Sequence, residues 1–158
     1  MQWLELRIPP LALIVAVVVG MIGTTHGLPP LRFALPGAAA MAVVGAIIGA
    51  SLAILGVYEF RRAKTTVNPV RPGNASRVVT SGVYRLSRNP MYIGVLLLLL
   101  ALAAYQSHAL SFAWVAGFVV YLNRFQIGPE ERVLESMFGD EYRAYTGAVR
   151  RELGGRRS

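Results

Sequence analysis

The sequence contains no cysteine, few charged residues and only two histidines. The absence of cysteine excludes disulfides, thiolate nucleophiles and cysteine-ligated zinc. Charged residues make up 15% of the 158 residues and hydrophobic residues 54%, whereas soluble domains carry ~25% charge. The chain is therefore too apolar for an ordinary soluble domain, and its composition is typical of a protein embedded in the lipid bilayer.

Four apolar runs can be read along the chain. The second contains Gly45 and Gly49, a spacing of small residues that lets helices approach closely, and we expect it to serve packing within the molecule. The last two runs are short and are joined by Gln106-Ser-His108, which predicts a helical hairpin. We predict an all-α polytopic membrane bundle of about four transmembrane helices, at about residues 8–24, 33–58, 91–105 and 110–122.

The length allows one domain, residues 1–158, in which the first two spans occupy 1–58 and the remainder occupies 59–158. Residues 59–89 are basic and interrupted by proline and glycine, which predicts a long polar loop. Pro90 suits the first turn of the third helix, so Arg88 is expected just outside that helix.

The net charge of +8 does not indicate nucleic-acid binding, because the basic residues flank the apolar runs. Seven lie in residues 59–89 and seven in 124–157, whereas the two outer turns hold only Arg32. This asymmetry predicts that both termini and the polar loop lie on the cytoplasmic side, in contact with anionic membrane lipids. We expect a multi-pass protein of a bacterial inner membrane.

Residues 128–139 have the pattern of an amphipathic helix. Pro129 suits its first turn, Glu130 and Glu131 complement the positive helix start, and Gly139 is expected just past its end. Asp140 could cap a second short helix that carries Tyr142 and Tyr145.

Polar chemistry is expected at the cytoplasmic membrane boundary. His26 and His108 both fall in the outer turns as interfacial residues, so carboxylates are the only candidate bases on the inner side, and no metal site is expected. Glu130 and Glu131 could also be simple dipole complements. A second cluster lies where the chain enters the third span, and its arginines could equally anchor lipid phosphates: Arg85, Arg88 and Tyr92.

Two stretches, separated by the hydrophobic hairpin, carry a specific resemblance. The first is Val79-Thr-Ser-Gly-Val-Tyr-Arg-Leu-Ser-Arg-Asn-Pro-Met-Tyr-Ile-Gly94, and the second is Glu130-Glu-Arg-Val-Leu-Glu-Ser-Met-Phe-Gly-Asp-Glu-Tyr-Arg-Ala-Tyr145. In order and spacing they resemble the isoprenylcysteine carboxyl methyltransferase family and the related phospholipid N-methyltransferases. The resemblance extends over about residues 65–151.

The resemblance implies a site for S-adenosylmethionine between cytoplasmic loops and the membrane hairpin, which makes 59–158 the cofactor-binding catalytic part. It implies catalytic roles for Arg88, Glu130 and Glu131. Asn89 stands where the family usually has histidine, and asparagine can hydrogen-bond but cannot shuttle a proton. The implied cofactor-binding residues are Tyr84, Arg88, Asn89, Pro90, Tyr92, Gly94, Glu130 and Glu131.

The implied activity is methyl transfer to a lipophilic small molecule or a lipidated group. A carboxylate acceptor needs no general base, so the lack of an inner-side histidine favours carboxyl O-methylation over methylation of an amine. Two alternatives stay open from the residues alone. One is a nicotinamide-dependent membrane reductase of lipids or sterols, although no glycine-rich dinucleotide motif is present. The other is a non-catalytic lipid-binding membrane protein.

Overall fold

A computed structural model describes residues 5–64 and 76–151. The helices in chain order are α1 (Pro10–Gly27), α2 (Ala38–Arg62), α3 (Pro90–Gln106), α4 (Ala109–Leu122) and α5 (Gly128–Ala148). Short helical turns lie at Pro29–Leu31 (η2) and Gly82–Arg85 (η4), and a π-helical turn at Asn123–Ile127 (η5) joins α4 to α5.

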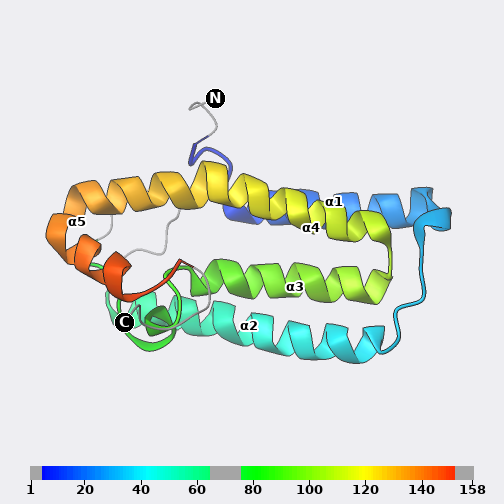
Figure 1. Ribbon diagram of the computed structural model, residues 1–158, viewed down its shortest axis with the longest axis horizontal. Helices are drawn as coiled ribbons and strands as arrows, with labels where there is room; N and C mark the ends of the chain where they lie inside the picture. Colours follow the sequence, from blue (N-terminus) through cyan, green and yellow to red (C-terminus); the bar gives the residue numbers. More distant parts are fainter. Residues whose placement is uncertain (1–4, 65–75, 152–158) are drawn as a thin grey trace.

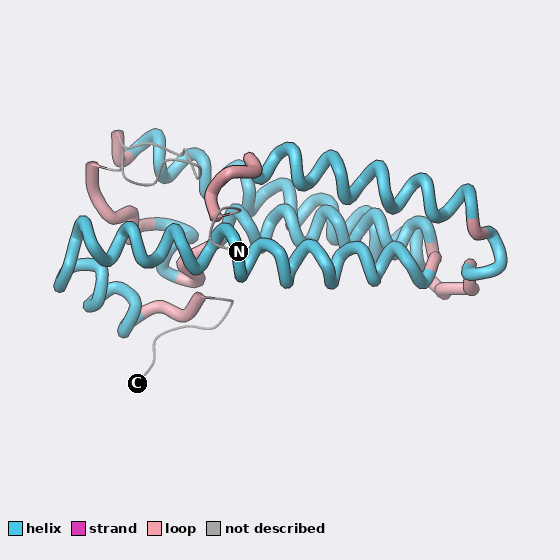
Figure 2. The backbone as a smooth tube through the Cα atoms, turned by 90° about the horizontal axis from the view of Figure 1, so that it is seen from above, coloured by secondary structure: helices cyan, strands magenta, loops and turns pink. Residues whose placement is uncertain are grey.

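The bundle has two layers of antiparallel helices. In Figure 1, α1 lies with α4 and α2 lies with α3, and Figure 2 shows the same elongated bundle from above. The core between the layers contains Val17, Met21, Leu99, Val115 and Phe118. The ends of α2 and α4 and the start of α3 lie at one end of the bundle, from which α5 projects. The polar residues of the candidate site lie at this end.

The helices have the length and surface of membrane spans. Three continuous helices, Pro10–Gly27, Ala38–Arg62 and Ala109–Ala148, are long and apolar enough to cross a membrane, and α3 is a shorter apolar helix of 17 residues. Large apolar side chains on α1 and α2 face outward, as lipid-facing residues do. The predicted all-α membrane bundle is confirmed. The charged α5, which follows the apolar part of the last helix, lies beyond its membrane-spanning segment.

The α2–α3 interface is the most extensive helix contact, and glycines make it close. A Cβ atom placed on Gly49 would lie 2.6 Å from the carbonyl oxygen of Gly94, and one placed on Gly94 would lie 2.6 Å from the carbonyl oxygen of Gly49. A Cβ on Gly45 would lie 3.3 Å from the Cβ of Ala101. The prediction that Gly45 and Gly49 serve packing within the molecule is confirmed.

Two predicted boundaries were wrong. The second helix does not end before residue 59 but continues to Arg62, and Glu59 is buried inside it. Its carboxylate accepts a hydrogen bond from the Ser81 hydroxyl, which offsets the cost of burial. Residues 65–75 of the predicted polar loop lie outside the described residues.

The fourth span and the amphipathic helix are not separate. They form one continuous helix because the π-helical turn at Asn123–Ile127 widens the helix just before Pro129, whose missing N–H and ring disturb a regular turn. Gly139, by contrast, interrupts the helix as predicted. Its φ of 49° and ψ of −118° are not helical, so Gly128–Ala148 consists of two helices that meet at a kink at this glycine.

His108 is not an interfacial residue, although it lies in the expected turn. Its side chain is fully buried, and its Nε2 lies 2.9 Å from the carbonyl oxygen of Leu28. It thereby ties the α3–α4 turn to the end of α1, at the end of the bundle opposite α5. His26, in the last turn of α1, is exposed.

Candidate active site

The residues singled out from the sequence lie mainly at the end of the bundle where α3 begins and α5 projects. Four pieces of chain meet there: η4, the start of α3, the η5–α5 junction, and residues 149–151. Pro90 is the first residue of α3 and is fully buried, and Asn89 precedes it. Arg88 therefore lies just outside the helix, as predicted.

Tyr92 and Glu130 form the first pair of the site. The Tyr92 hydroxyl donates a hydrogen bond to Oε2 of Glu130 at 3.1 Å. Burial raises the pKa of Glu130 from its ordinary 4.5 to about 7; the Tyr92 hydrogen bond acts in the opposite direction, and the neighbouring Glu131 adds to the increase. No arginine, lysine or histidine in residues 5–64 and 76–151 forms an ion pair with Glu130. Glu130 is thus a desolvated carboxylate without a cationic partner in the described chain.

Glu131 has the opposite environment, because two arginines hold it. Arg88 Nη1 lies 3.1 Å from Glu131 Oε1, and both side chains are only 16% exposed. Arg151 donates through Nε to Oε1 at 3.1 Å and through Nη2 to Oε2, which is a bidentate pair. Arg88 also hydrogen-bonds the hydroxyl of Tyr142, while its buried Nε has no partner among the described atoms.

Residues 149–151 lie along residues 87–89 and fix their backbone. The Arg88 N–H donates to the carbonyl oxygen of Arg150 at 3.1 Å, and the Ser87 hydroxyl donates to that of Arg151 at 2.9 Å. The Asn89 side-chain amide reaches the same Arg151 oxygen at 3.5 Å. Asn89 thus serves as a hydrogen-bond donor, a role that asparagine fulfils without a titratable proton.

Tyr84 anchors η4 beneath the site. It is buried, its ring packs edge-on against Phe60 with centroids 5.3 Å apart, and its carbonyl oxygen accepts a hydrogen bond from the Tyr145 hydroxyl at 2.8 Å. Burial, and secondarily the charge of Glu130, raises the pKa of the Tyr84 hydroxyl, so this tyrosine stays neutral. Tyr84 is therefore a buried aromatic residue close enough to Glu130 for that charge to act on it.

Gly82 is required by the turn that presents Tyr84. Its φ is +56°, and an added Cβ would collide with the carboxylate of Glu59. We expect Gly82→Ala to lower the free energy of unfolding by ~1–2 kcal/mol, because an L-residue is strained in this conformation. Thermal unfolding in detergent measures the change. Gly147→Ala, in α5 with no atom within 4 Å of the added Cβ, is the matched control. Equal stability of both variants would contradict the assignment.

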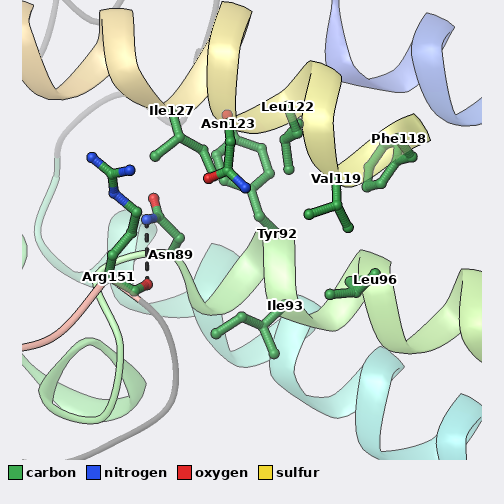
Figure 3. A pocket seen from close by; sticks show the side chains of 10 residues that line it. All are labelled: Asn89, Tyr92, Ile93, Leu96, Phe118, Val119, Leu122, Asn123, Ile127 and Arg151. Carbon is green, nitrogen blue, oxygen red and sulfur yellow. Dashed lines mark hydrogen bonds between the residues drawn. The ribbon is translucent and has the colours of Figure 1, made fainter. Parts of the chain in front are cut away.

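A cavity of about 110 Å³ lies between α3 and the α4–η5 helix. In Figure 3, Tyr92 projects from α3 toward the facing helix, while Asn89 and Arg151 lie together at the polar end. The remaining wall is apolar except for Asn123. It is formed by Ile93, Leu96, Phe118, Val119, Leu122 and Ile127. The polar pairs and an apolar recess thus adjoin at this end of the bundle.

Comparison with known proteins identifies the family of the chain. The sequence pattern of the phospholipid methyltransferase family matches residues 38–141, well over half of the 158 residues. The chain belongs to this family. It is also 48% identical over 63 residues, 40% of this chain and 100% of the relative, to an uncharacterized protein of Haemophilus influenzae. No solved structure matches the chain.

Within this phospholipid methyltransferase family member, most of the predicted site residues are close together. Tyr92 contacts Glu130, Arg88 contacts Glu131, and Asn89 lines the cavity. Gly94 faces α2 and makes a close helix contact. Arg85 is exposed.

Sequence reasoning missed three residues of the site. They are Arg151, which pairs with Glu131 and lines the cavity, Tyr142, which contacts Arg88, and Gln126, which contacts Tyr92. Arg151 was one of seven basic residues in 124–157 that were used only to predict the orientation, so it had no distinguishing signal. Tyr142 was visible as the first tyrosine of the second family-like stretch but had no assigned partner.

Proposed function

We propose that this family member is an integral membrane S-adenosylmethionine-dependent methyltransferase that acts on a lipophilic or lipidated acceptor, with carboxyl O-methylation as its preferred reaction. The observation that carries the proposal is Glu130, a desolvated carboxylate with no ion-pair partner among the described residues. Desolvated carboxylates are costly unless a cation neutralises them. A cationic cofactor fits that requirement, and family membership favours a methyltransferase over the reductase and the lipid-binding protein.

The polar and aromatic side chains of the site fit S-adenosylmethionine, which carries a sulfonium, an ammonium, a carboxylate and an adenosine. Glu130 would hold a cationic group, and Arg88, whose buried Nε has no partner in the described chain, would hold the carboxylate. Tyr84 and Tyr92 offer aromatic surface at the same place. When bound, S-adenosylmethionine supplies a methyl group to the acceptor oxygen, and the electron pair of the broken carbon–sulfur bond stays on sulfur.

The chain's own residues would orient the acceptor and exclude water. The cavity is smaller than the ~150 Å³ that accommodates benzene, so it suits a small apolar portion of a ligand adjoining the lipid phase. Asn89, Asn123 and Arg151 would hold an anionic or polar head at its polar end. A carboxylate acceptor needs no proton removed, and His108 lies at the opposite end of the bundle.

A methylated amine is the second candidate, and one observation favours it. An ammonium acceptor must lose a proton first, and the pKa of Glu130 at about 7 suits a general base. The preference for a carboxylate rests on the arginine at the polar end of the cavity, since a cation there repels an ammonium.

The site would lie on the cytoplasmic side of a bacterial inner membrane, together with both termini. The support is the distribution of basic residues, since Arg32 is the only one in the outer turns. Because S-adenosylmethionine is made and used in the cytoplasm, this orientation also places the site where the cofactor is supplied.

Two measurements on the detergent-solubilised protein test the proposal. Calorimetric titration with S-adenosylmethionine is expected to show stoichiometric binding, and absence of binding by folded protein would overturn the cofactor. Incubation with methyl-labelled S-adenosylmethionine and a bacterial lipid extract is expected to label the lipid fraction. Alkali should release that label as methanol from a methyl ester, whereas alkali-stable label would indicate the amine.

A further inference from the structure

Gln126 is a buried polar residue that no recognised motif contains. Its side chain is 2% exposed, and it lies in the π-helical turn Asn123–Ile127 between the membrane-spanning α4 and the charged α5. Two other residues of this turn, Asn123 and Ile127, line the cavity. Single π-helical turns occur often at functional sites, and a buried amide has to be hydrogen-bonded.

The Gln126 side chain forms a hydrogen bond with the hydroxyl of Tyr92. That hydroxyl has one proton, which it donates to Oε2 of Glu130 at 3.1 Å. Gln126 therefore has to donate its side-chain N–H to the Tyr92 oxygen. The result is a directed chain of hydrogen bonds from the amide to the phenol and from the phenol to the carboxylate.

The helix geometry places both ends of this chain on one face. Gln126 and Glu130 are four residues apart, and side chains at this spacing are neighbours on a helix surface. The Gly128 N–H bonds the carbonyl oxygen of Asn123, five residues earlier, and a Cβ on Gly128 would lie 3.2 Å from that oxygen. The widened turn at a glycine thus lets Gln126 face Tyr92 directly ahead of Pro129.

We propose that Gln126 is a positioning residue for Glu130: its amide fixes the Tyr92 hydroxyl as a donor, and this keeps the Glu130 carboxylate an ionised acceptor directed into the site. The inference rests on the proposed function, in which Glu130 receives a cationic group of the cofactor. If the amide were absent, a protonated Glu130 could donate to the Tyr92 oxygen instead. The neutral carboxyl, which cannot pair with a cation, would then gain stability.

The other titratable groups around Glu130 do not favour its ionised form. Glu131 and the phenols of Tyr84 and Tyr142 are the further titratable groups whose charges act on it, alongside Tyr92 itself. Glu131 disfavours a second negative charge, and the Tyr142 hydroxyl hydrogen-bonds Arg88. Tyr92, directed by Gln126, is the group that hydrogen-bonds the ionised form.

The test follows the ionisation of Glu130 itself in the cofactor-free protein, by infrared or carboxyl ¹³C titration, with Glu130→Gln identifying the signal. We expect Gln126→Met, which keeps the side-chain length but removes the amide, to move the midpoint upward by roughly 0.5–1 pH unit, since one hydrogen bond is lost. In a Tyr92→Phe background the same substitution should move it by less than about 0.2 unit, because Gln126 acts only through the hydroxyl.

An unchanged midpoint in Gln126→Met, or an equal shift in the Tyr92→Phe background, would overturn the inference. S-adenosylmethionine binding by the wild type, measured in parallel, tests the proposed function separately. If the wild type binds and the midpoint does not move, only the role of Gln126 fails. If the midpoint moves and the wild type does not bind, the cofactor assignment fails and Gln126 still controls the ionisation of Glu130.

Discussion

Glu130→Gln is expected to weaken S-adenosylmethionine binding by ~10- to 100-fold, because it removes a charge-assisted interaction with a cationic group. Wild-type affinity should rise with pH through about 7, as Glu130 ionises, and level off above that value. The amide introduced by the substitution does not titrate, so the affinity of the variant should not change across this range. Calorimetry between about pH 5.5 and 8.5, on either side of that pKa, measures both effects.

Stability in the absence of cofactor separates this effect from misfolding. The pKa of Glu130 is about 7 in the folded protein and 4.5 ordinarily, so its ionisation costs no stability below about pH 4.5. The cost grows as pH rises from 4.5 to 7 and is fully present above 7. Glu130→Gln should therefore unfold at a higher temperature than the wild type at about pH 8, and at a similar one at about pH 4.5.

The matched control is Glu135→Gln, which removes a carboxylate from an exposed position of the same helix. It should retain wild-type affinity and wild-type pH dependence. If Glu130→Gln bound as tightly as this control, or if its affinity still followed pH, Glu130 would not be the cationic subsite.

Gly94→Ala is expected to destabilise the α2–α3 pair more than any other single methyl addition in α3. The added Cβ would lie 2.6 Å from the carbonyl oxygen of Gly49 and 2.7 Å from the backbone nitrogen of Ala53. Backbone atoms of a packed helix cannot move aside as a flexible side chain can, so the helices have to separate. Overpacking of this kind costs ~1–3 kcal/mol or more. Thermal unfolding and the yield of folded protein in detergent measure the loss.

Gly117→Ala is the control for this substitution. Gly117 lies in α4, and a Cβ there has no atom within 4 Å. Alanine should be neutral or stabilising at that position by up to ~1 kcal/mol, because glycine is the poorer helix former. A Gly94→Ala variant as stable as Gly117→Ala would show that the helices have room to spare, and would return Gly94 to consideration as a cofactor contact.

The sequence predicted the helices well and their ends less well. Hydrophobic run lengths located four apolar helices, since the bilayer imposes a length and a composition that are visible in the chain. The end of α2 was misplaced because Glu59 reads as the first residue of a polar loop, whereas the Ser81 hydroxyl allows its burial. The continuity of α4 and α5 was missed because proline predicts a new start, and a π-helical turn leaves no comparable sequence signal.

The candidate site was predicted in part. Tyr92, Arg88, Glu130 and Glu131 were expected near one another through family resemblance, and the structure pairs them as Tyr92 with Glu130 and Arg88 with Glu131. Which glutamate carries an ion pair could not be read from two adjacent identical residues. Their environments differ because consecutive helical positions point about 100° apart, toward α3 in one case and toward two arginines in the other.

By itself, the sequence determined the all-α membrane class, the family and the polar end of the bundle, because each depends on local composition or on linear spacing. Only the tertiary structure decided that Gly94 packs against Gly49, that Arg151 pairs with Glu131, and that Tyr92 hydrogen-bonds both Gln126 and Glu130. These contacts join residues that are distant in the chain, or they depend on the π-helical turn at Asn123–Ile127, which changes the helical register. Hydrogen bonds and burial are set by distances in space, to which linear spacing gives no direct access.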